Sequence, residues 1–137
     1  RPGNIYVKEF PSGTCTVADI DNTIKSYEDK HSIKIDFVVV DYISIMAQDT
    51  RGGDNLYMNG KNLSNGLRAI AQIRELVMVT AMQVGKDNFG ASDISMADIS
   101  ESKAIVENAD TMFGIIRTDE MRKQNKYILL NIRLNSI

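Results

Sequence analysis

Five short apolar runs divide the chain, and each has the length of a β-strand rather than of a helix. They are "NIYVKEF" (residues 4–10), "DFVVVD" (36–41), "ELVMVTAM" (75–82), "TMFGIIR" (111–117) and "KYILLNIR" (126–133). Three of the runs are continuously apolar rather than alternating, which is typical of strands that helices cover on both faces. The pattern therefore predicts a mostly parallel, five-stranded α/β sheet.

Helical periodicity fills the segments between these runs. One apolar stripe precedes residue 36, a second precedes residue 75, and a third, shorter helix is expected from Ser100 through "ESKAIVENA", burying Ile105 and Ala109. The first two stripes consist of Val17, Ile20, Ile24 and Tyr27, and of Leu63, Leu67, Ile70 and Ala71. Thr16 with Asp19 supplies a start for the first helix.

The order of these elements predicts right-handed β-α-β crossovers. Only the polar stretch "TDEMRKQN" separates the last two runs, which suits a hairpin, so we expect the sheet to end with an antiparallel pair. Two further connections, residues 47–62 and 84–97, are long and rich in Gly, Asn, Asp and Ser. Both follow the carboxyl end of a strand, the edge at which open α/β sheets bind ligands.

Length and composition limit the classes of protein to consider. A chain of 137 residues with 43% hydrophobic content suits one domain. Its net charge of -2 excludes a polybasic nucleic-acid binder, although a local cationic patch remains compatible. With one cysteine, Cys15, and one histidine, His31, the chain offers neither an internal disulfide nor a structural zinc site.

The sequence also bears on location. No apolar run reaches the length of about 18 residues expected of a membrane span. The first ten residues, "RPGNIYVKEF", lack the basic-then-apolar form of a secretory signal. We therefore expect a cytoplasmic protein.

The strand "DFVVVD" delivers one carboxylate, Asp41, to the ligand-binding edge. There it can hold a hydrated Mg²⁺ beside phosphate oxygens. The next strand brings Gln83 to the same edge, where its amide can donate to a phosphate oxygen or orient a water. Ordinary roles stay open for both residues, since a strand-end aspartate often caps a turn and a glutamine there is often simply solvated. Together they outline a nucleotide site.

Three segments carry a resemblance to a known family. "VVVDY", "VTAMQVGK" and "MADISESKAIVENADTMFGIIRT", in this order, resemble the second half of the RecA-like motor domain of DnaB-type replicative helicases, above all those of T-even-type phages. The likeness runs from "IYVKEFPSG" to "NIRLNS" and so covers residues 1–137 almost entirely. The D-I-x-E-S segment followed by Ala109 and Asp110 is its most specific part.

This resemblance implies roles for individual residues. Asp41 matches the Walker B carboxylate on Mg²⁺, and Gln83 matches the sensor that couples the γ-phosphate of ATP to a DNA-facing loop. Arg133 matches an arginine finger that reaches the nucleotide of an adjacent subunit, a role suited to a permanently charged guanidinium. The family usually has a Lys two positions before this Arg and a Gly two positions after it, where this chain has Asn131 and Asn135. The second cation of the family's pair is thus missing.

The same resemblance places single-stranded DNA along the segment "DISESKA". Residues that match Ser100, Glu101 and Lys103 line the central channel of the ring in the family. Ser100 can cap a short helix whose first amides bind a phosphate, although a purely structural cap is the alternative. Lys86 and Arg51, in the two polar connections, are further candidates for DNA binding. The resemblance also implies a ring-forming homo-oligomer, a hexamer, that works with a primase and a helicase loader.

One part of a nucleotide site is missing from the sequence. No G-x-x-x-x-G-K-[S/T] loop is present, and "NGKNLSNG" has the wrong spacing and follows no strand. The family places that loop before the region that matches residue 1, so we expect a helicase fragment that does not hydrolyse ATP by itself.

Three other interpretations stay open. A receiver domain phosphorylated on Asp41 would need an acidic pair after the first strand, where the chain offers only Glu9. A noncatalytic nucleic-acid-binding or assembly module with a RecA-like fold would bind single strands without nucleotide. A recombinase-type or clock-type ATPase shares the strand-end Asp and Gln, and only the D-I-x-E-S segment disfavours it.

Overall fold

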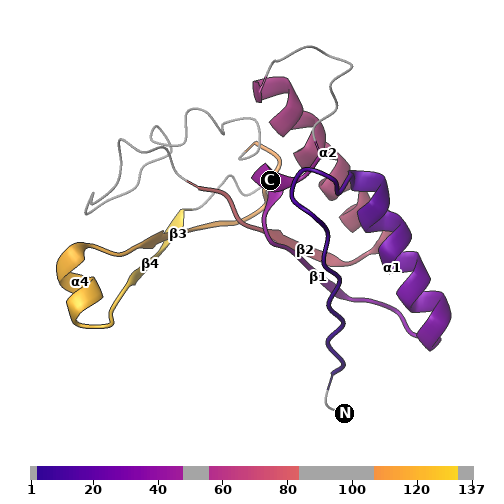
Figure 1. The fold of residues 1–137 in the computed structure, drawn as a ribbon, viewed down its shortest axis with the longest axis horizontal. Helices are drawn as coiled ribbons and strands as arrows, with labels where there is room; N and C mark the ends of the chain where they lie inside the picture. Colours follow the sequence, from indigo (N-terminus) through magenta and orange to yellow (C-terminus); the bar gives the residue numbers. More distant parts are fainter. Residues whose placement is uncertain (1–2, 48–55, 84–106, 133–137) are drawn as a thin grey trace.

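The computed structural model describes residues 3–47, 56–83 and 107–132 of the chain (Figure 1). Helix α1 (Val17–His31) begins where the sequence predicts, because Thr16 and Asp19 form a capping box. The Thr16 hydroxyl accepts from the Asp19 amide at 3.1 Å, and the Thr16 amide donates to the Asp19 carboxylate at 2.9 Å. The helix ends at Ser32, whose left-handed φ of 50° turns the chain towards the first strand.

Strands β1 (Phe37–Val40) and β2 (Val77–Thr80) form a parallel pair, in register from Phe37 beside Val77 to Val40 beside Thr80. A short 3-10 helix, η1 (Ile43–Ile45), and helix α2 (Leu56–Arg74) lie between them in sequence. Parallel strands require such a crossover. This arrangement confirms the predicted α/β class.

Helix α2 is longer than its apolar stripe suggests. The predicted polar connection over residues 47–62 was too long, because the helix already begins at Leu56. Asn59 is buried one turn before Leu63, so the buried face extends beyond the apolar residues. Packing of this face outweighs Gly60, which costs a helix about 0.5–1 kcal/mol relative to alanine.

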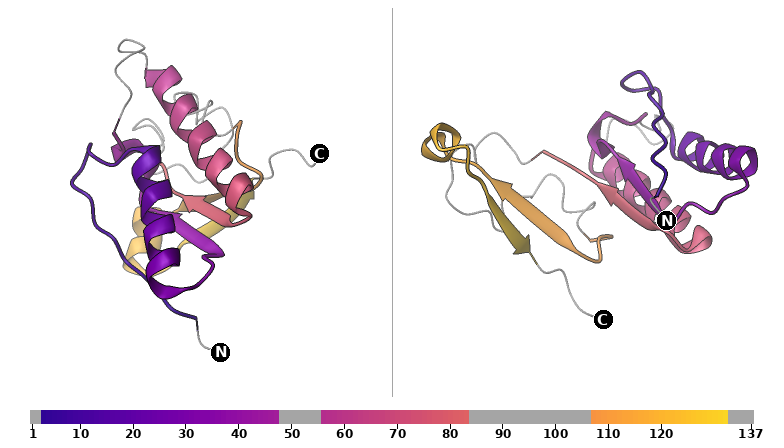
Figure 2. Two further views of the ribbon diagram at one scale, coloured as in Figure 1. Left: turned by 90° about the vertical axis from the view of Figure 1, so that its right-hand side faces the viewer. Right: turned by 90° about the horizontal axis from the view of Figure 1, so that it is seen from below.

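The core lies between one face of the β1–β2 sheet and the two long helices, which Figure 2 shows beside each other against the strands. One cluster joins Val40, Ile43 and Met46 to Leu67 of α2, and the other joins Ile24 of α1 to Ile70 and Leu76. Val38 and Met78 of the sheet pack against these clusters. The predicted stripes of both helices therefore face the core, except for Tyr27, which lies against Tyr6 and Val7 of the N-terminal segment. Among the described helices, none combines the length and apolar character needed to span a bilayer.

The strand predicted for residues 4–10 is not formed. This segment has no strand partner within the described residues, and Ile5 and Val7 are almost fully exposed. The segment contacts α1 instead. The Tyr27 hydroxyl donates to the Val7 carbonyl at 3.3 Å, and the centre of the Tyr6 ring lies 4.7 Å from that of the His31 ring. Apolar alternation alone does not make a strand, because the ladder hydrogen bonds need a neighbouring edge.

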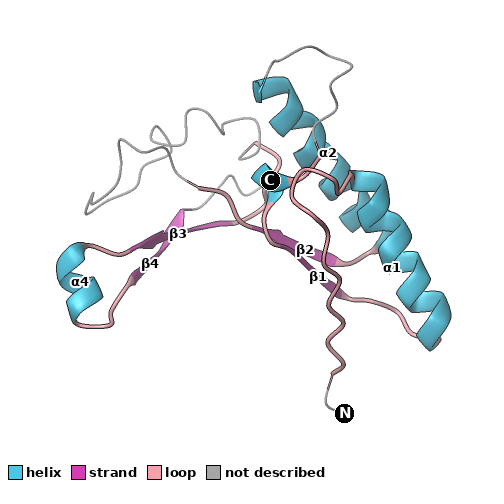
Figure 3. Ribbon diagram, viewed as in Figure 1, coloured by secondary structure: helices cyan, strands magenta, loops and turns pink. Residues whose placement is uncertain are grey.

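Strands β3 (Met112–Ile116) and β4 (Ile128–Ile132) form the predicted antiparallel pair. The polar link between them contains the short helix α4 (Asp119–Lys123), which the Thr118 side chain caps (Figure 3). The described residues thus hold four strands in two two-stranded sheets rather than five in one. The third predicted helix, from Ser100, lies mostly outside the described residues.

Candidate nucleotide site at the carboxyl end of the parallel strands

Asp41 and Gln83 leave the β1–β2 sheet at the same edge. Asp41 directly follows β1, whose last residue, Val40, is in register with Thr80 at the end of β2. Gln83 comes three residues after Thr80, and both Asp41 and Gln83 are exposed. Parallel pairing places the two carboxyl ends together, at the edge where open α/β sheets bind ligands. The structure therefore brings these two predicted site residues to one end of the molecule's parallel sheet.

Thr80 ties the two strand ends to each other. Its hydroxyl donates to the Val40 carbonyl at 2.8 Å and accepts from the Ile43 amide at 3.1 Å. The Ile43 amide also donates to the Ala81 carbonyl at 3.3 Å. These bonds hold the backbone on both sides of Asp41 against β2. Sequence reasoning missed this role, and its only signal was a hydroxyl at the end of an apolar strand.

The segment after Asp41 is anchored from two further sides. The Ile43 side chain is fully buried in the core. The Ile45 carbonyl accepts from the Gly13 amide at 2.8 Å, and the Ala47 amide donates to the Cys15 carbonyl at 2.8 Å. The peptide bond between Asp41 and Tyr42 is cis. The carboxylate thus projects from a backbone that three segments of the chain hold in place.

Cys15 belongs to this anchor and not to the reactive groups. Its side chain is buried, and its thiol lies close to the carbonyl of Thr16. Burial, together with the nearby charge of Asp19, raises the pKa of the Cys15 thiol. A thiol with a raised pKa stays protonated at neutral pH and is a poor nucleophile.

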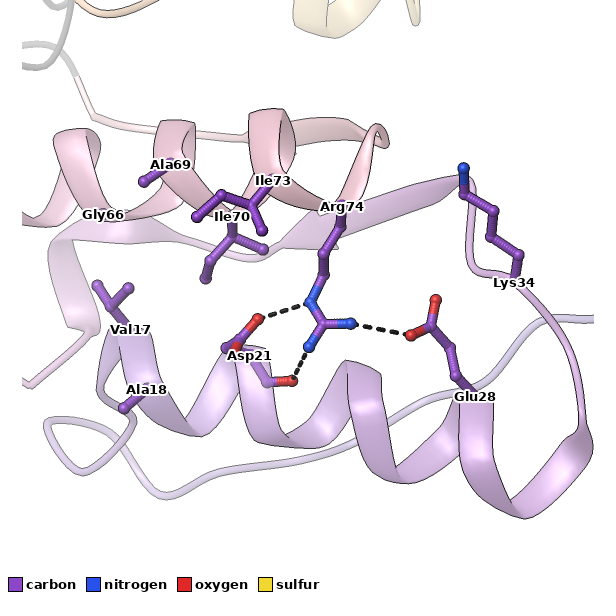
Figure 4. Close-up of a pocket in the computed structure, with 10 residues that line it drawn as sticks. All are labelled: Val17, Ala18, Asp21, Glu28, Lys34, Gly66, Ala69, Ile70, Ile73 and Arg74. Atoms are coloured by element: carbon purple, nitrogen blue, oxygen red, sulfur yellow. Dashed lines mark hydrogen bonds and ion pairs between the residues drawn. The ribbon is translucent and has the colours of Figure 1, made fainter.

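A hollow lies on the helical layer, between α1 and α2 (Figure 4). It has a volume of about 830 Å³, and neither Asp41 nor Gln83 lines it. Arg74 spans its floor, with Nε 2.6 Å from an Asp21 carboxylate oxygen and Nη1 2.9 Å from a Glu28 carboxylate oxygen. The Arg74 hydrogen bond lowers the pKa of Asp21. Because two carboxylates and a backbone carbonyl already engage this guanidinium, the hollow is a poor site for a phosphate.

The other predicted site residues lie outside the described residues. They are Arg133, the predicted arginine finger, and the DNA-binding candidates Ser100, Glu101, Lys103, Lys86 and Arg51. Asn131, which occupies the position of the family's second cation, is described: it is exposed in β4, in register with Phe113 of β3.

The comparison with known protein families decides what kind of chain this is. The profile named "DnaB-like helicase C terminal domain" matches residues 2–134. The chain belongs to this family.

Two curated DnaB-like relatives match most of the chain. The DnaB-like replicative helicase of Enterobacteria phage T4 is 32% identical over 137 residues, which cover 96% of this chain and 28% of that protein. The replicative DNA helicase DnaB of Geobacillus stearothermophilus is 27% identical over 129 residues, which cover 91% of this chain and 28% of that protein. This DnaB-like chain therefore spans little more than a quarter of the length of either relative.

Solved structures give the same fold. An ATPase domain superposes with a TM-score of 0.74 at 17% identity, over 88% of this chain and 44% of that one. A structure of a DnaB-like replicative helicase and its interactions with primase superposes with a TM-score of 0.70 at 20% identity, over 83% of this chain and 27% of that one. The likeness confirms the predicted RecA-like fold of this DnaB-like chain.

The residues of this DnaB-like chain fit a hydrated magnesium ion better than a fully coordinated one. In the part of the chain that the structure describes, no cluster of three or more metal-ligating side chains exists. Asp41 is a single exposed carboxylate, and the nearby Thr80 hydroxyl is already used in backbone hydrogen bonds. Mg²⁺ keeps several waters and commonly takes one carboxylate together with nucleotide phosphates. The donor set therefore suits Mg²⁺ that arrives with a nucleotide.

Proposed function

We propose that this chain is part of an ATP-dependent, ring-forming replicative DNA helicase that translocates on single-stranded DNA. The observation that carries the proposal is the parallel register of β1 and β2, which puts Asp41 and Gln83 at one edge in a chain of the DnaB-like family. A receiver domain or an unrelated module would not require both groups there.

Asp41 and Gln83 have different proposed roles at this edge. The Asp41 carboxylate would hold a hydrated Mg²⁺, and the hydrogen bonds of the Thr80 hydroxyl to Val40 and Ile43 fix the backbone on either side of this carboxylate. The Gln83 amide donates to the γ-phosphate of ATP and transmits its presence to the segment that follows. When bound, Mg²⁺ neutralises the charge that develops on the phosphate oxygens.

The remaining roles come from the family resemblance. Arg133 reaches the nucleotide of the adjacent subunit, which requires a head-to-tail interface. The family resemblance implies that this interface closes into a ring, a hexamer. Ser100, Glu101 and Lys103 contact the backbone of single-stranded DNA in the channel, and Lys86 and Arg51 add positive charge nearby. A primase and a helicase loader are the proposed partners, and the (host) cytoplasm is the proposed location.

Hydrolysis of ATP tests the first part of the proposal. The 137-residue chain alone should show no ATPase activity, since it has no G-x-x-x-x-G-K-[S/T] loop. In the longer protein that carries this loop, Asp41→Asn should lower the rate of hydrolysis by about 100-fold or more. Asp36→Asn is the matched control, because Asp36 is an exposed aspartate at the opposite end of β1. Robust hydrolysis by the isolated chain, or equal rates for the two variants, would refute the proposal.

Binding of single-stranded DNA tests the second part. In the longer protein with ATP bound, Lys103→Ala should weaken binding to all sequences alike and lower the salt dependence by about one unit of slope. Lys30→Ala changes an exposed lysine in the last turn of α1 and should leave binding unchanged. Tight, steeply salt-dependent binding by the isolated chain without nucleotide would instead favour a noncatalytic module.

A further inference from the structure

Four polar residues join helix α2 to the segment that leads into β3. They are Ser64 and Arg68 of α2 and Asn108 and Asp110 of the segment, and we call them the α2 cluster. Arg68 Nη1 donates to the Asn108 carbonyl at 2.7 Å and to an Asp110 carboxylate oxygen at 2.9 Å. Asn108 Nδ2 donates to the Ser64 hydroxyl at 2.7 Å. The partners in these bonds are 40 to 44 positions apart in the sequence, so the α2 cluster is a tertiary contact and not a local turn.

The α2 side of the cluster is the better buried one. Ser64 is 7% exposed, and its hydroxyl donates to the Lys61 carbonyl at 3.2 Å, so its oxygen is oriented to accept from Asn108. The Arg68 side chain is 32% exposed, whereas that of Asp110 is 79% exposed. An ion pair with so exposed a carboxylate adds little to the stability of a fold. Its consequence is geometric, because α2 holds the backbone and the side chain of Asn108 as well as the Asp110 carboxylate.

Helix α2 is itself fixed to the nucleotide edge at this point. Leu67, which precedes Arg68, packs in one core cluster with Val40 and Ile43. These two residues lie on either side of Asp41 in the sequence. One turn of α2 therefore contacts the strand end that carries Asp41 through Leu67, and the segment before β3 through Arg68.

The α2 cluster also lies close in sequence to the predicted DNA-binding residues. Asn108 comes five residues after Lys103, and Asp110 ends the most specific part of the family likeness. The proposed function leaves Asp110 without a role. Five residues span at most about 18 Å when fully extended, so an Asn108 bound to α2 limits how far Lys103 can lie from that helix. A cation whose position is already restricted loses less conformational freedom when it binds a phosphate.

We propose that Arg68 is a positioning residue for single-stranded DNA that does not itself touch the strand. It holds Asn108 and Asp110 on α2 and so restricts the DNA-binding segment that precedes them. Because α2 also contacts the strand that ends at Asp41, one helix fixes the segment and the nucleotide edge together. The role in DNA binding rests on the proposed function, whereas the α2 cluster does not.

Binding of single-stranded DNA by acid-to-amide variants tests this proposal. The probe is an unstructured oligonucleotide, added to the longer protein that carries the phosphate-binding loop, with ATP bound. Asp110→Asn should weaken binding by about 10-fold, because the segment must then be ordered when the strand binds. Electrostatics alone predicts the opposite sign, since removal of an acid favours a polyanion. Arg68→Met should weaken binding by a similar factor, and the double variant should lose no more than either single one.

The matched control is Glu107→Gln. Glu107 belongs to the same segment, is exposed, and forms no ion pair with another described residue. This variant removes the same charge as Asp110→Asn and should bind the oligonucleotide equally well or more tightly. Arg68→Lys keeps a cation within reach of Asp110 and should recover most of the affinity that Arg68→Met loses. Thermal unfolding followed by circular dichroism shows whether each variant folds, and Asp110→Asn decides the matter if Arg68→Met does not.

Three outcomes count against the proposal in different ways. If the unsubstituted protein binds the oligonucleotide and Asp110→Asn binds it equally well or more tightly, Arg68 does not position the segment. If Arg68→Met also lowers the salt dependence by about one unit of slope, Arg68 contacts a phosphate directly, and the proposal fails. If the unsubstituted protein does not bind single-stranded DNA at all, the proposed function fails, and the DNA role of Arg68 fails with it.

Discussion

The two faces of the β1–β2 sheet carry similar side chains but have different surroundings. On the face towards α1 and α2, Val40 is 8% exposed, whereas its neighbour Val39, on the opposite face, is 61% exposed. Hydrophobicity is therefore not what distinguishes them. Helix α1, which precedes β1 in the sequence, and helix α2, which lies between β1 and β2, cover the first face, and no described segment covers the second. The difference teaches that apolar side chains on both sides of a strand make it suitable for burial on both faces. Which face is buried depends on the helices that pack against the sheet.

The largest effect should come from the centre of the helix-covered face. Ile43→Ala removes a fully buried side chain and should lower the free energy of unfolding by about 2–5 kcal/mol, through lost burial and the cavity that remains. Urea denaturation followed by circular dichroism measures it. Ile45→Ala, at a 37% exposed position of the same short helix, is the control and should cost clearly less. Equal losses would mean that this core does not hold the strand end.

Adjacent valines sharpen the comparison between the two faces. Val40→Ala should cost about 2 kcal/mol, at about 0.8 kcal/mol for each buried methyl plus a cavity term. Val39→Ala should stay within about 0.5 kcal/mol in the isolated chain, because that side chain is largely exposed. Both variants are compared by urea denaturation. Equal costs for Val39→Ala and Val40→Ala would show that the face of the sheet that carries Val39 is also buried in solution.

The ion-pair network on the outer side of the helix-covered face should contribute less. Arg74→Met should lower the free energy of unfolding by about 1–2 kcal/mol, since Asp21 and Glu28 lose a shared, partly buried partner. Lys34→Met is the control, because the Lys34–Glu75 pair is largely exposed. A null result for Arg74→Met in urea denaturation would show that packing alone holds α1 to α2.

The same network predicts a pH dependence. Asp21 has a lowered pKa in the folded chain, so it binds protons less readily there than in the unfolded chain. Its contribution is fully present above the unfolded pKa of about 3.9 and is lost as the pH falls through the folded value. The free energy of unfolding, measured from about pH 6 to about pH 3, should therefore fall less steeply in Arg74→Met than in the unsubstituted chain. This range brackets the unfolded pKa of about 3.9. Parallel pH profiles would contradict this role.

The smallest effect concerns the approach of the two helices. A Cβ added at Gly66 of α2 would lie 2.8 Å from a Val17 methyl carbon of α1. Gly66→Ala should therefore destabilise the chain by about 1 kcal/mol, although alanine by itself favours a helix. In the Val17→Ala background the same substitution should become neutral or stabilising. Thermal unfolding of the four variants gives the coupling, and additive effects would show that the contact is absent.

Sequence patterns anticipated those features that depend on neighbouring residues or on strand order. The Thr16–Asp19 capping box, the buried stripe of α2 and the hairpin after Ile116 all follow from local spacing. The common edge of Asp41 and Gln83 follows from parallel strand order alone. The roles of these two residues, and of Arg133, stay predictions that the proposed experiments test.

Tertiary structure decided the features that need a partner distant in sequence. Residues 4–10 have the composition of a strand, but the Tyr6 ring lies against the Tyr27 and His31 rings of α1, and no strand edge among the described residues pairs with the segment. Thr80 holds Val40 and Ile43, and Arg74 joins Asp21 to Glu28, through contacts that span more than thirty residues each. Continuous apolar runs indicated that β1 and β2 suit cover on two faces, yet only the tertiary structure shows which of these faces α1 and α2 cover. The reason is that apolar periodicity identifies the side chains that gain free energy from burial, whereas burial itself requires another segment to pack against them.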